Sequence, residues 1–428
     1  MIQLGCDKNT VDGERILGEL DAGGFRIVGA DAAGRGGRNR LGLLVVNTCS
    51  FIGPARAESI RAIEGAADLK RRGRVRRVAV AGCFSKLLEG QLTEKLRGDI
   101  DYFIGPGDID RTVAIVTGQE EAHFRPPARS MVAGPRLLTN SSGTAFVKIA
   151  EGCDKTCSFC TIPSIRGKFV SRDPALVIDE IDALTQCGVR EIVLVSQDTA
   201  SYGGDIRSTL AELIRRIDRI DATFRLRIHY LYPSQVTDDL IEAVADSPHA
   251  VPYFDIPIQH ASPVVLKAMR RPPNVDAISR LVDRIRTRFA ESAIRTTVIA
   301  GHPGETVKEF HKLLSFIRKT EFDRLGVFPF SPEPGTAAAS MKRPLHAEER
   351  AREVMEVQSL ISAKRLAARV GRAYDVLMDT PREGRTGLEA PDVDGVVHFP
   401  ESILLSPGQL LRANIKGSDA HDLYAEAA

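Results

Sequence analysis

The chain has 428 residues, of which 43% are hydrophobic and 27% charged, and its formal net charge is +2. This length exceeds what one hydrophobic core usually supports, so two or three domains are expected. Hydrophobic runs such as LGLLVV (41–46) are too short to span a bilayer, and no signal peptide precedes the first motif, which predicts a cytosolic protein that does not associate with a membrane.

Residues 1–120 are predicted to form an N-terminal parallel α/β domain. Hydrophobic segments alternate with helical patterns: LLVVN (43–47), a helix near 54–72, VRRVAVAG (75–82) and a helix near 85–97. This alternation is typical of a parallel sheet with crossover helices. Only four residues precede Gly5, so the first strand of the sheet is expected to be short.

Residues 144–370 are predicted to form a partial barrel of six β/α units, after a Pro-, Gly- and Ser-rich linker over 121–143. Six hydrophobic segments are each next to a helical pattern: TAFVKIAEG (144–152), EIVLVSQD (191–198), RLRIHYLY (225–232), YFDIPIQ (253–259), IRTTVIAG (294–301) and RLGVFPF (324–330). The active site of such a barrel lies at the carboxyl ends of its strands. A charged helix over 347–371 follows, and the short β-type segments of 371–428 predict a small all-β barrel.

Three of the seven cysteines, Cys153, Cys157 and Cys160, form a C-x3-C-x2-C motif at the end of a predicted strand. Three thiolates can bind three irons of a 4Fe-4S cluster and leave the fourth iron open. Structural zinc prefers four protein ligands, often in two pairs, and the sequence offers no second pair. The spacing, with Phe159 before the last cysteine, resembles that of radical S-adenosylmethionine (SAM) enzymes, in which SAM binds the open iron.

A second set of cysteines is spread along the N-terminal domain. Cys6, Cys49 and Cys83 each follow a hydrophobic strand and precede a helical stretch. Three neighbouring parallel strands would bring these thiols to one edge of the sheet, which favours a second cluster over three unrelated buried thiols. The remaining Cys187 has core-like spacing in the helical stretch 175–187 and is interpreted as a packing residue.

The two cysteine triads, in this order, resemble the methylthiotransferase family of radical SAM enzymes over essentially the whole chain. The motifs that carry the resemblance are GCDKNTVDGERILGEL (5–20), NTCSFIGPARAES (47–59), KIAEGCDKTCSFCTIPSIRGKFVSR (148–172), LVSQDTASYGGD (194–205), DIPIQHAS (255–262), HPGET (302–306) and FSPEPGTAA (330–338). The resemblance implies two 4Fe-4S clusters, with the N-terminal one handling sulfur, and a TRAM domain at the C-terminus. It also implies that SAM serves both as methyl donor and as radical source.

The resemblance further implies contacts to SAM outside the triads, at Phe159, Gln197, Asp198, Gln259, His260, Gly301 and Glu305. All but the first lie at or near the ends of predicted strands. Each has a simpler structural interpretation: Gly301 could form a turn, and His260 could be a hydrogen-bonded core histidine. A radical step requires no conventional acid–base pair, and no catalytic residue is assigned.

The family has one branch that modifies an adenosine in tRNA and another that modifies an aspartate in a small-subunit ribosomal protein. Residues 372–428 contain five basic and ten acidic residues, a net charge of −5. RNA-binding domains are usually basic, whereas an acidic domain complements a basic ribosomal protein. The motifs QDTASYGGD (197–205), HYLYPS (229–234) and FDRLGVFPFSPEPGT (322–336) also resemble the ribosomal-protein branch more than the tRNA branch. The resemblance and the charge together predict an enzyme that places a methylthio group on the β-carbon of an aspartate in the ribosomal protein S-twelve.

Two alternatives stay open. A tRNA adenosine methylthiotransferase would use the same chemistry, whereas a non-catalytic iron–sulfur protein that binds the ribosome would not cleave SAM. The basic run KRRGRVRR (70–77) would allow contact with RNA, although a solvated helix end is the simpler interpretation. The sequence does not identify the electron donor or the sulfur donor.

Overall fold

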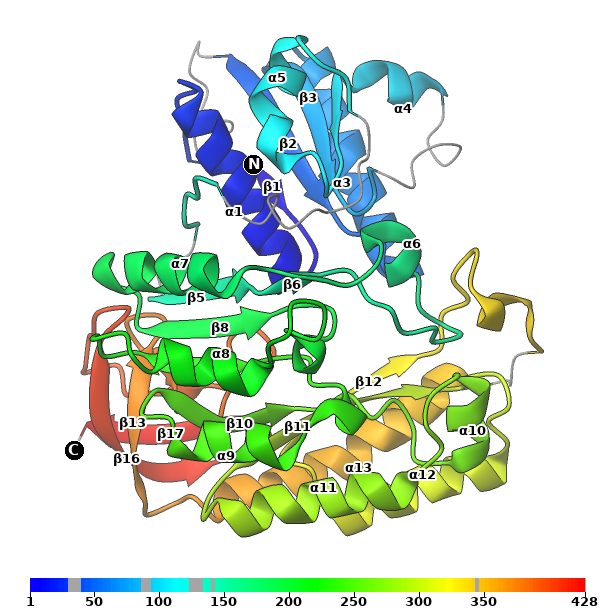
Figure 1. The fold of residues 1–428 in the computed structure, drawn as a ribbon, viewed down its shortest axis with the longest axis vertical. Coiled ribbons are helices and arrows are strands. Elements are labelled where there is room, and N and C mark those ends of the chain that lie inside the picture. Colours follow the sequence, from blue (N-terminus) through cyan, green and yellow to red (C-terminus); the bar gives the residue numbers. More distant parts are fainter. Residues whose placement is uncertain (30–39, 86–93, 123–133, 140–142, 343–345, 428) are drawn as a thin grey trace. The chain divides into compact units, whose positions relative to one another are not determined.

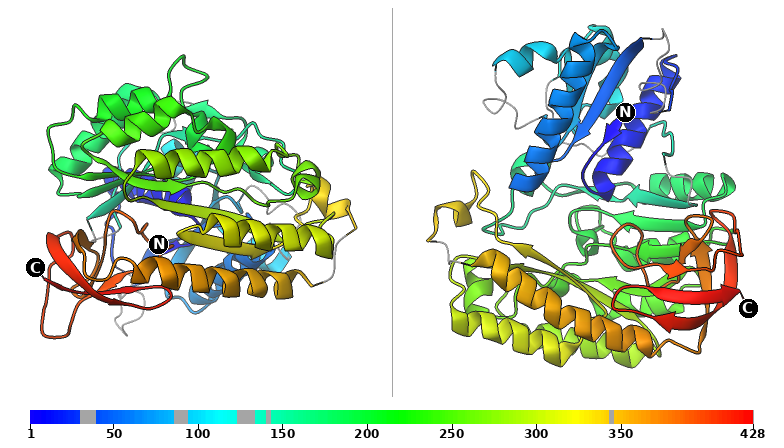
Figure 2. Two further views of the ribbon diagram at one scale, coloured as in Figure 1. Left: turned by 90° about the horizontal axis from the view of Figure 1, so that it is seen from below. Right: turned by 180° about the vertical axis from the view of Figure 1, so that it is seen from behind.

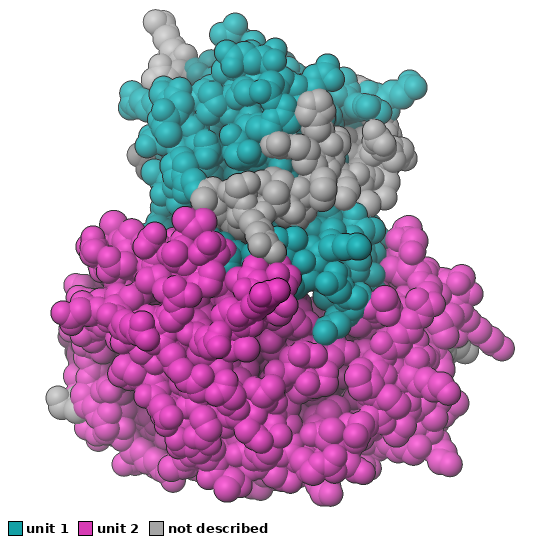
Figure 3. All heavy atoms as spheres, viewed as in Figure 1, with its two compact units in different colours: residues 1–139, 150–155, 160–172 teal, residues 140–149, 156–159, 173–428 magenta. Residues whose placement is uncertain are grey.

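The structure is a computed structural model (Figure 1, Figure 2) that describes residues 1–29, 40–85, 94–122, 134–139, 143–342 and 346–427. The chain forms two compact units (Figure 3). The first comprises residues 1–139, 150–155 and 160–172, and the second residues 140–149, 156–159 and 173–428. Within the described ranges, no helix is long and apolar enough to cross a membrane. Much of the linker predicted over 121–143 lies outside the described residues.

The first unit is built on a four-stranded parallel sheet with the order β1-β2-β3-β4. Its strands are β1 (Ile2–Gln3), β2 (Leu41–Thr48), β3 (Val75–Gly82) and β4 (Tyr102–Ile104), and its helices include α1 (Asp7–Ala22), α3 (Gly53–Arg71), α4 (Glu94–Asp99) and α5 (Thr112–Thr117). The first strand is short, as predicted. The helix predicted near 54–72 corresponds to α3. Of the helix predicted near 85–97, residues 86–93 lie outside the described part of the chain.

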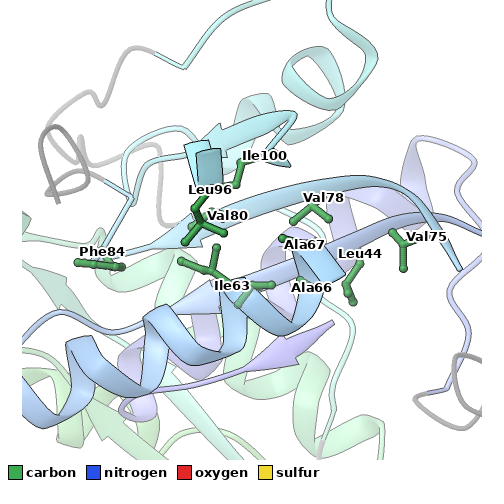
Figure 4. Close-up of a cluster of buried hydrophobic side chains, with 11 residues drawn as sticks. Leu44, Ile63, Ala66, Ala67, Val75, Val78, Val80, Phe84, Leu96 and Ile100 are labelled. Carbon is green, nitrogen blue, oxygen red and sulfur yellow. The ribbon is translucent and has the colours of Figure 1, made fainter. Parts of the chain in front are cut away.

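Both faces of this sheet are buried, because helices cover both. Val78 and Val80 of β3 pack with Ile63 of α3 in one hydrophobic cluster (Figure 4). The alternate residues Ala79 and Ala81 belong to a second cluster that includes residues of α1 and α5. This arrangement follows from the two-residue period of a strand, and it leaves the carboxyl ends of the strands at one edge of the sheet.

The second unit contains a six-stranded parallel sheet with the order β12-β11-β10-β9-β8-β5, which is the order of the chain. The strands are those predicted: β5 (Thr144–Lys148), β8 (Glu191–Val195), β9 (Arg225–Ile228), β10 (Ala250–Asp255), β11 (Ala293–Ala300) and β12 (Arg324–Pro329). The helices that connect or follow these strands lie on one side of the curved sheet (Figure 2). These helices are α7 (Pro174–Gln186), α8 (Leu210–Ile217), α9 (Asp238–Asp246), α10 (Pro263–Ala268), α11 (Val275–Arg288), α12 (Val307–Thr320) and α13 (Ala347–Ala367).

The last residues form a small closed barrel, as predicted, with the order β13-β14-β15-β17-β16. Its strands are β13 (Ala373–Met378), β14 (Glu383–Arg385), β15 (Val397–His398), β16 (Leu410–Ser418) and β17 (Leu423–Ala427). The barrel has its own core, to which Leu366 of α13 also contributes. Helix α13, which also packs against β11 and β12 of the central sheet, therefore contributes one side chain to the barrel core.

Buried ion pairs join the barrel to the central sheet. Glu191 lies 2.8 Å from Nε of Arg227 and 2.7 Å from Nη1 of Arg385. Burial alone would raise the pKa of Glu191, but its neighbouring arginines lower the pKa to about 2. Glu389 of the barrel is likewise buried and paired with Arg369 and with Arg324. These pairs bury one cation (Arg385) and one anion (Glu389) of the barrel, so they leave its net charge of −5 unchanged.

Candidate functional site

Cys6, Cys49 and Cys83 follow the carboxyl ends of β1, β2 and β3 in the first unit, as predicted. Cys6 is the N-cap residue of α1, so its thiol lies beside the first turn of that helix. Burial raises the pKa of Cys83 to about 12 despite the opposing effect of Arg166, and the Cys6 and Cys49 thiols raise it further. The three thiols are therefore within electrostatic reach of one another at one sheet edge.

Buried polar side chains fix the backbone around these thiols. The Ser59 hydroxyl of α3 accepts a hydrogen bond from the Cys49 N–H at 3.0 Å and donates to the Cys49 carbonyl at 2.8 Å. Asn47 donates to the Asn9 carbonyl at 2.8 Å, and Asn9 donates to the Leu4 carbonyl at 2.6 Å. The segments that carry Cys6 and Cys49 are thus held together without using either sulfur as a structural link.

Arg166, the last residue of α6 (Ile162–Arg166), reaches the Cys83 sulfur. Its Nε and Nη2 lie 3.2 and 3.0 Å from Sγ. Its Nη1 donates to Asp12 at 2.6 Å and to Glu151 at 3.2 Å. The sequence analysis did not predict this arginine. It lies in the motif at 148–172, but no residue pattern in that motif distinguishes it from an arginine exposed on the surface.

The donor set at this edge consists of thiols. Among the described residues, no group of three or more His, Cys, Asp or Glu side chains is arranged to hold a single metal ion. A cluster spaces its thiolates more widely than a single ion does, and an all-thiolate donor set is that of an iron–sulfur cluster. The residues present therefore fit a cluster with three protein ligands better than a structural zinc ion, which requires four.

The C-x3-C-x2-C motif occupies the loop between β6 (Ala150–Glu151) and α6. Cys153 and Cys160 belong to the first unit and Cys157 to the second. The Cys153 N–H donates to the Gly167 carbonyl at 3.1 Å, and its sulfur accepts a hydrogen bond from the Lys155 N–H at 3.4 Å. Gly152 has a φ of +78°, and a Cβ there would lie 2.1 Å from the Lys168 carbonyl oxygen, so the turn into the motif requires glycine.

Within the second unit, His302 contacts the two residues between Cys157 and Cys160. Its Nδ1 lies 2.8 Å from the Pro303 carbonyl, so Nδ1 carries the proton and Nε2 accepts from the Ser158 hydroxyl at 3.3 Å. Burial lowers the pKa of His302 to about 4, which keeps the ring neutral. Phe159 packs edge-on against this ring, with 6.1 Å between centroids. Two backbone hydrogen bonds also join Ser158 to Met269 and Ala338.

Three of the predicted SAM contacts form one buried hydrogen-bonded group. The Ser262 N–H donates to Nδ1 of His260 at 2.9 Å, so Nε2 carries the proton and donates to Glu305 at 3.0 Å. Glu305 also accepts from the Gly301 N–H at 3.0 Å and from Arg350 at 2.5 Å. Hydrogen bonds within the protein thus explain why His260 and Glu305 are buried here. Contact of these two residues with SAM stays a prediction.

The other predicted contacts lie beyond strand ends of the same sheet. Gln197 and Asp198 follow β8, and Asp198 is buried and accepts a hydrogen bond from the Ser201 hydroxyl at 2.7 Å. Gln259 follows β10, and its N–H donates to the Thr297 carbonyl of β11 at 2.8 Å. The structure therefore brings the predicted residues to one end of the sheet, while their roles stay predictions.

Cys187 is not a packing residue, contrary to the sequence analysis. It is the C-cap residue of α7 and is exposed. The helix ends at Gln186, and Gly188, with a φ of +90°, turns the chain directly afterwards. The helix therefore ends one residue before Cys187, and the helical spacing that suggested a buried thiol does not extend to it.

Three family models match the chain. The Radical SAM superfamily matches residues 147–317, the Uncharacterized protein family UPF0004 residues 1–105, and the TRAM domain residues 370–428. The ribosomal protein uS12 methylthiotransferase RimO of Sorangium cellulosum is 39% identical over 446 residues, which cover 99% of this chain and 90% of that protein. The protein of the same name from Alkalilimnicola ehrlichii is 40% identical, over 99% of this chain and 96% of its own.

Solved structures with the same fold include a radical S-adenosylmethionine methyltransferase, TsrM, from Kitasatospora setae. The TM-score is 0.59, with 16% identity over 78% of this chain and 72% of that chain. At this identity the likeness concerns the fold alone.

Proposed function

Because the chain belongs to the family of RimO-type ribosomal protein uS12 methylthiotransferases, which are radical SAM enzymes, we propose that it attaches a methylthio group to the β-carbon of an aspartate in uS12. The product is 3-methylthioaspartate. The observation that carries the proposal is identity of 37 to 40% along nearly the full chain. Both cysteine triads of this sequence support it. A cytosolic location stays a prediction.

The radical SAM family implies a 4Fe-4S cluster and SAM, and we propose Cys153, Cys157 and Cys160 as the cluster ligands. When bound, this cluster supplies the electron that cleaves SAM, and SAM supplies the 5′-deoxyadenosyl radical and a methyl group. The protein orients the motif: Ser158 is anchored by two backbone hydrogen bonds and by neutral His302. A neutral, hydrogen-bonded histidine at this position supports the loop without adding charge.

We further propose that Cys6, Cys49 and Cys83 bind a second 4Fe-4S cluster that handles sulfur. The thiol-only donor set and the position of the three thiols at one sheet edge support this assignment. The match of residues 1–105 to a family model is consistent with it. In this proposal Ser59, Asn9 and Asn47 hold the ligand-bearing segments in place through the hydrogen bonds described above.

A protein substrate suits the barrel better than a nucleic acid does. Three exposed basic side chains of the barrel each lie beside a carboxylate, in the pairs Arg382–Glu401 (3.8 Å), Arg412–Asp375 (3.1 Å) and Lys416–Glu426 (3.3 Å). Each exposed pair is weak, but a carboxylate beside each cation cancels much of the positive potential that would attract phosphates. Contact between the TRAM domain and ribosomal RNA near the target remains compatible with this arrangement.

Single cysteine substitutions test the two cluster assignments separately. We expect Cys157→Ala to lose about four irons per chain and to abolish SAM cleavage, measured as 5′-deoxyadenosine. We expect Cys49→Ala to lose a similar amount of iron, to retain SAM cleavage and to form no methylthio product. The exposed Cys187 provides a matched control, since Cys187→Ala should retain all three properties.

Each cluster assignment would be contradicted by a different result. Retained 5′-deoxyadenosine production by Cys157→Ala would contradict the radical-cluster assignment. Methylthio product from Cys49→Ala would contradict the second cluster. A full-length protein that binds iron but never cleaves SAM would favour a non-catalytic role on the ribosome.

A further inference from the structure

Arg166 directs two N–H groups at a single sulfur. Nε and Nη2 of its guanidinium lie 3.2 and 3.0 Å from Sγ of Cys83. A neutral thiol is a weak acceptor, so two buried guanidinium donors would gain little from it. A thiolate, free or bound to iron, is an anionic acceptor that suits a two-donor fork.

The rest of the guanidinium is fixed by carboxylates. Nη1 donates to Asp12 of α1 at 2.6 Å and to Glu151 of β6 at 3.2 Å. Arg166, Asp12 and Glu151 are all almost completely buried. The side chain therefore cannot swing into solvent, and its orientation toward the sulfur is imposed by protein groups on its other edge.

The position of Arg166 in the chain connects the two cysteine triads. It ends α6, the short helix that follows Cys160 directly, whereas Cys83 follows β3 of the N-terminal sheet. A residue six positions beyond the C-x3-C-x2-C motif thus contacts a ligand proposed for the other cluster. Both residues lie in the first unit.

We propose that Arg166 is a positioning residue that holds the Cys83 thiolate and raises the reduction potential of the cluster bound by Cys6, Cys49 and Cys83. This inference rests on the second cluster proposed above. Hydrogen bonds to a ligand sulfur withdraw electron density and stabilise the more negative, reduced cluster. Removing them makes the cluster harder to reduce.

The experiment uses the full-length chain with Cys153, Cys157 and Cys160 all replaced by Ala, so that only the N-terminal cluster can form. This parent and its Arg166→Gln and Arg166→Lys variants are reconstituted with iron and sulfide under anaerobic conditions. The fraction of reduced cluster is then followed by electron paramagnetic resonance as the solution potential is lowered with dithionite. Arg136→Lys is the control, because Arg136 is an arginine of the same unit with a 7% exposed side chain that pairs with Glu14 at 2.6 Å.

We expect Arg166→Gln to reduce the ratio of reduced to oxidised cluster at least about tenfold at a given potential, a shift of about −59 mV for a one-electron couple. Arg166→Lys retains the charge without the fork and should fall between Gln and the parent. Arg136→Lys should match the parent.

An unchanged potential in Arg166→Gln would overturn the inference. If Arg166→Gln binds no cluster, the Arg166→Lys variant decides: a parental potential, or failure to bind iron as well, rejects the tuning role. If the parent itself binds no iron, the proposed second cluster fails first and the inference fails with it, which separates the two results.

Discussion

Glu389 offers a test of how the barrel is attached to the central domain. This carboxylate is 1% exposed and is paired with Arg369 and Arg324. Burial would raise its pKa, but the two arginines lower the pKa from 4.5 to about 2. A shift of this size corresponds to about 3 kcal/mol of stability at neutral pH. Glu389→Gln leaves both arginines buried without their anion, which costs about 3–5 kcal/mol.

The direction of the pH dependence follows from the lowered pKa. The contribution of the ionised Glu389 is complete above pH 4.5 and is lost as the pH falls toward about 2. The difference between wild type and Glu389→Gln should therefore be largest at neutral pH and shrink over that window. Hydrogen exchange of the β16 amides measures it, and about 3 kcal/mol predicts roughly hundredfold faster exchange in the variant at pH 7.

Glu401→Gln is the matched control, because Glu401 has a 93% exposed side chain and lies 3.8 Å from Arg382. An exposed pair contributes little, so exchange should change by less than about threefold. Equal exchange rates in the two variants, or a Glu389→Gln effect that does not vary with pH, would refute the reasoning.

Two further substitutions test packing, with thermal unfolding as the measurement. Gly301→Ala should cost more than about 3 kcal/mol, because a Cβ there lies 2.4 Å from the Ala347 Cβ at a φ of +77°. Its control Gly335→Ala has a φ of +82° with open space around it and should cost about 1 kcal/mol; equal losses would remove the steric argument. Phe84→Ala removes a fully buried side chain from the cluster in Figure 4 and should cost about 3–5 kcal/mol. Phe328→Ala, at a side chain that is 50% exposed, should cost much less, and a similar loss would contradict the assigned core.

The sequence predicted the features that depend on local pattern and on parallel topology. The six central strands were recognisable because each is a hydrophobic segment next to a helical pattern. The convergence of Cys6, Cys49 and Cys83 followed because the ends of neighbouring parallel strands share one sheet edge. Both predictions required only the order of elements along the chain.

Features that depend on distant contacts were not predictable in this way. Arg166 and Cys83 are 83 positions apart, and an arginine is usually solvated, so no local pattern indicated their contact. Glu389 lies in a Pro-, Gly- and Asp-rich segment that resembles surface loop, yet ion pairs with the central domain bury it.

The most direct test of the proposed function is a competition between substrates. Enzyme with reconstituted clusters is supplied anaerobically with SAM, sulfide and a reductant, together with small ribosomal subunits and bulk tRNA. Mass spectrometry of both substrates then locates any methylthio group. We predict a methylthio group on an aspartate of uS12 and none on tRNA. A modified adenosine instead would preserve the chemistry but contradict the proposed substrate.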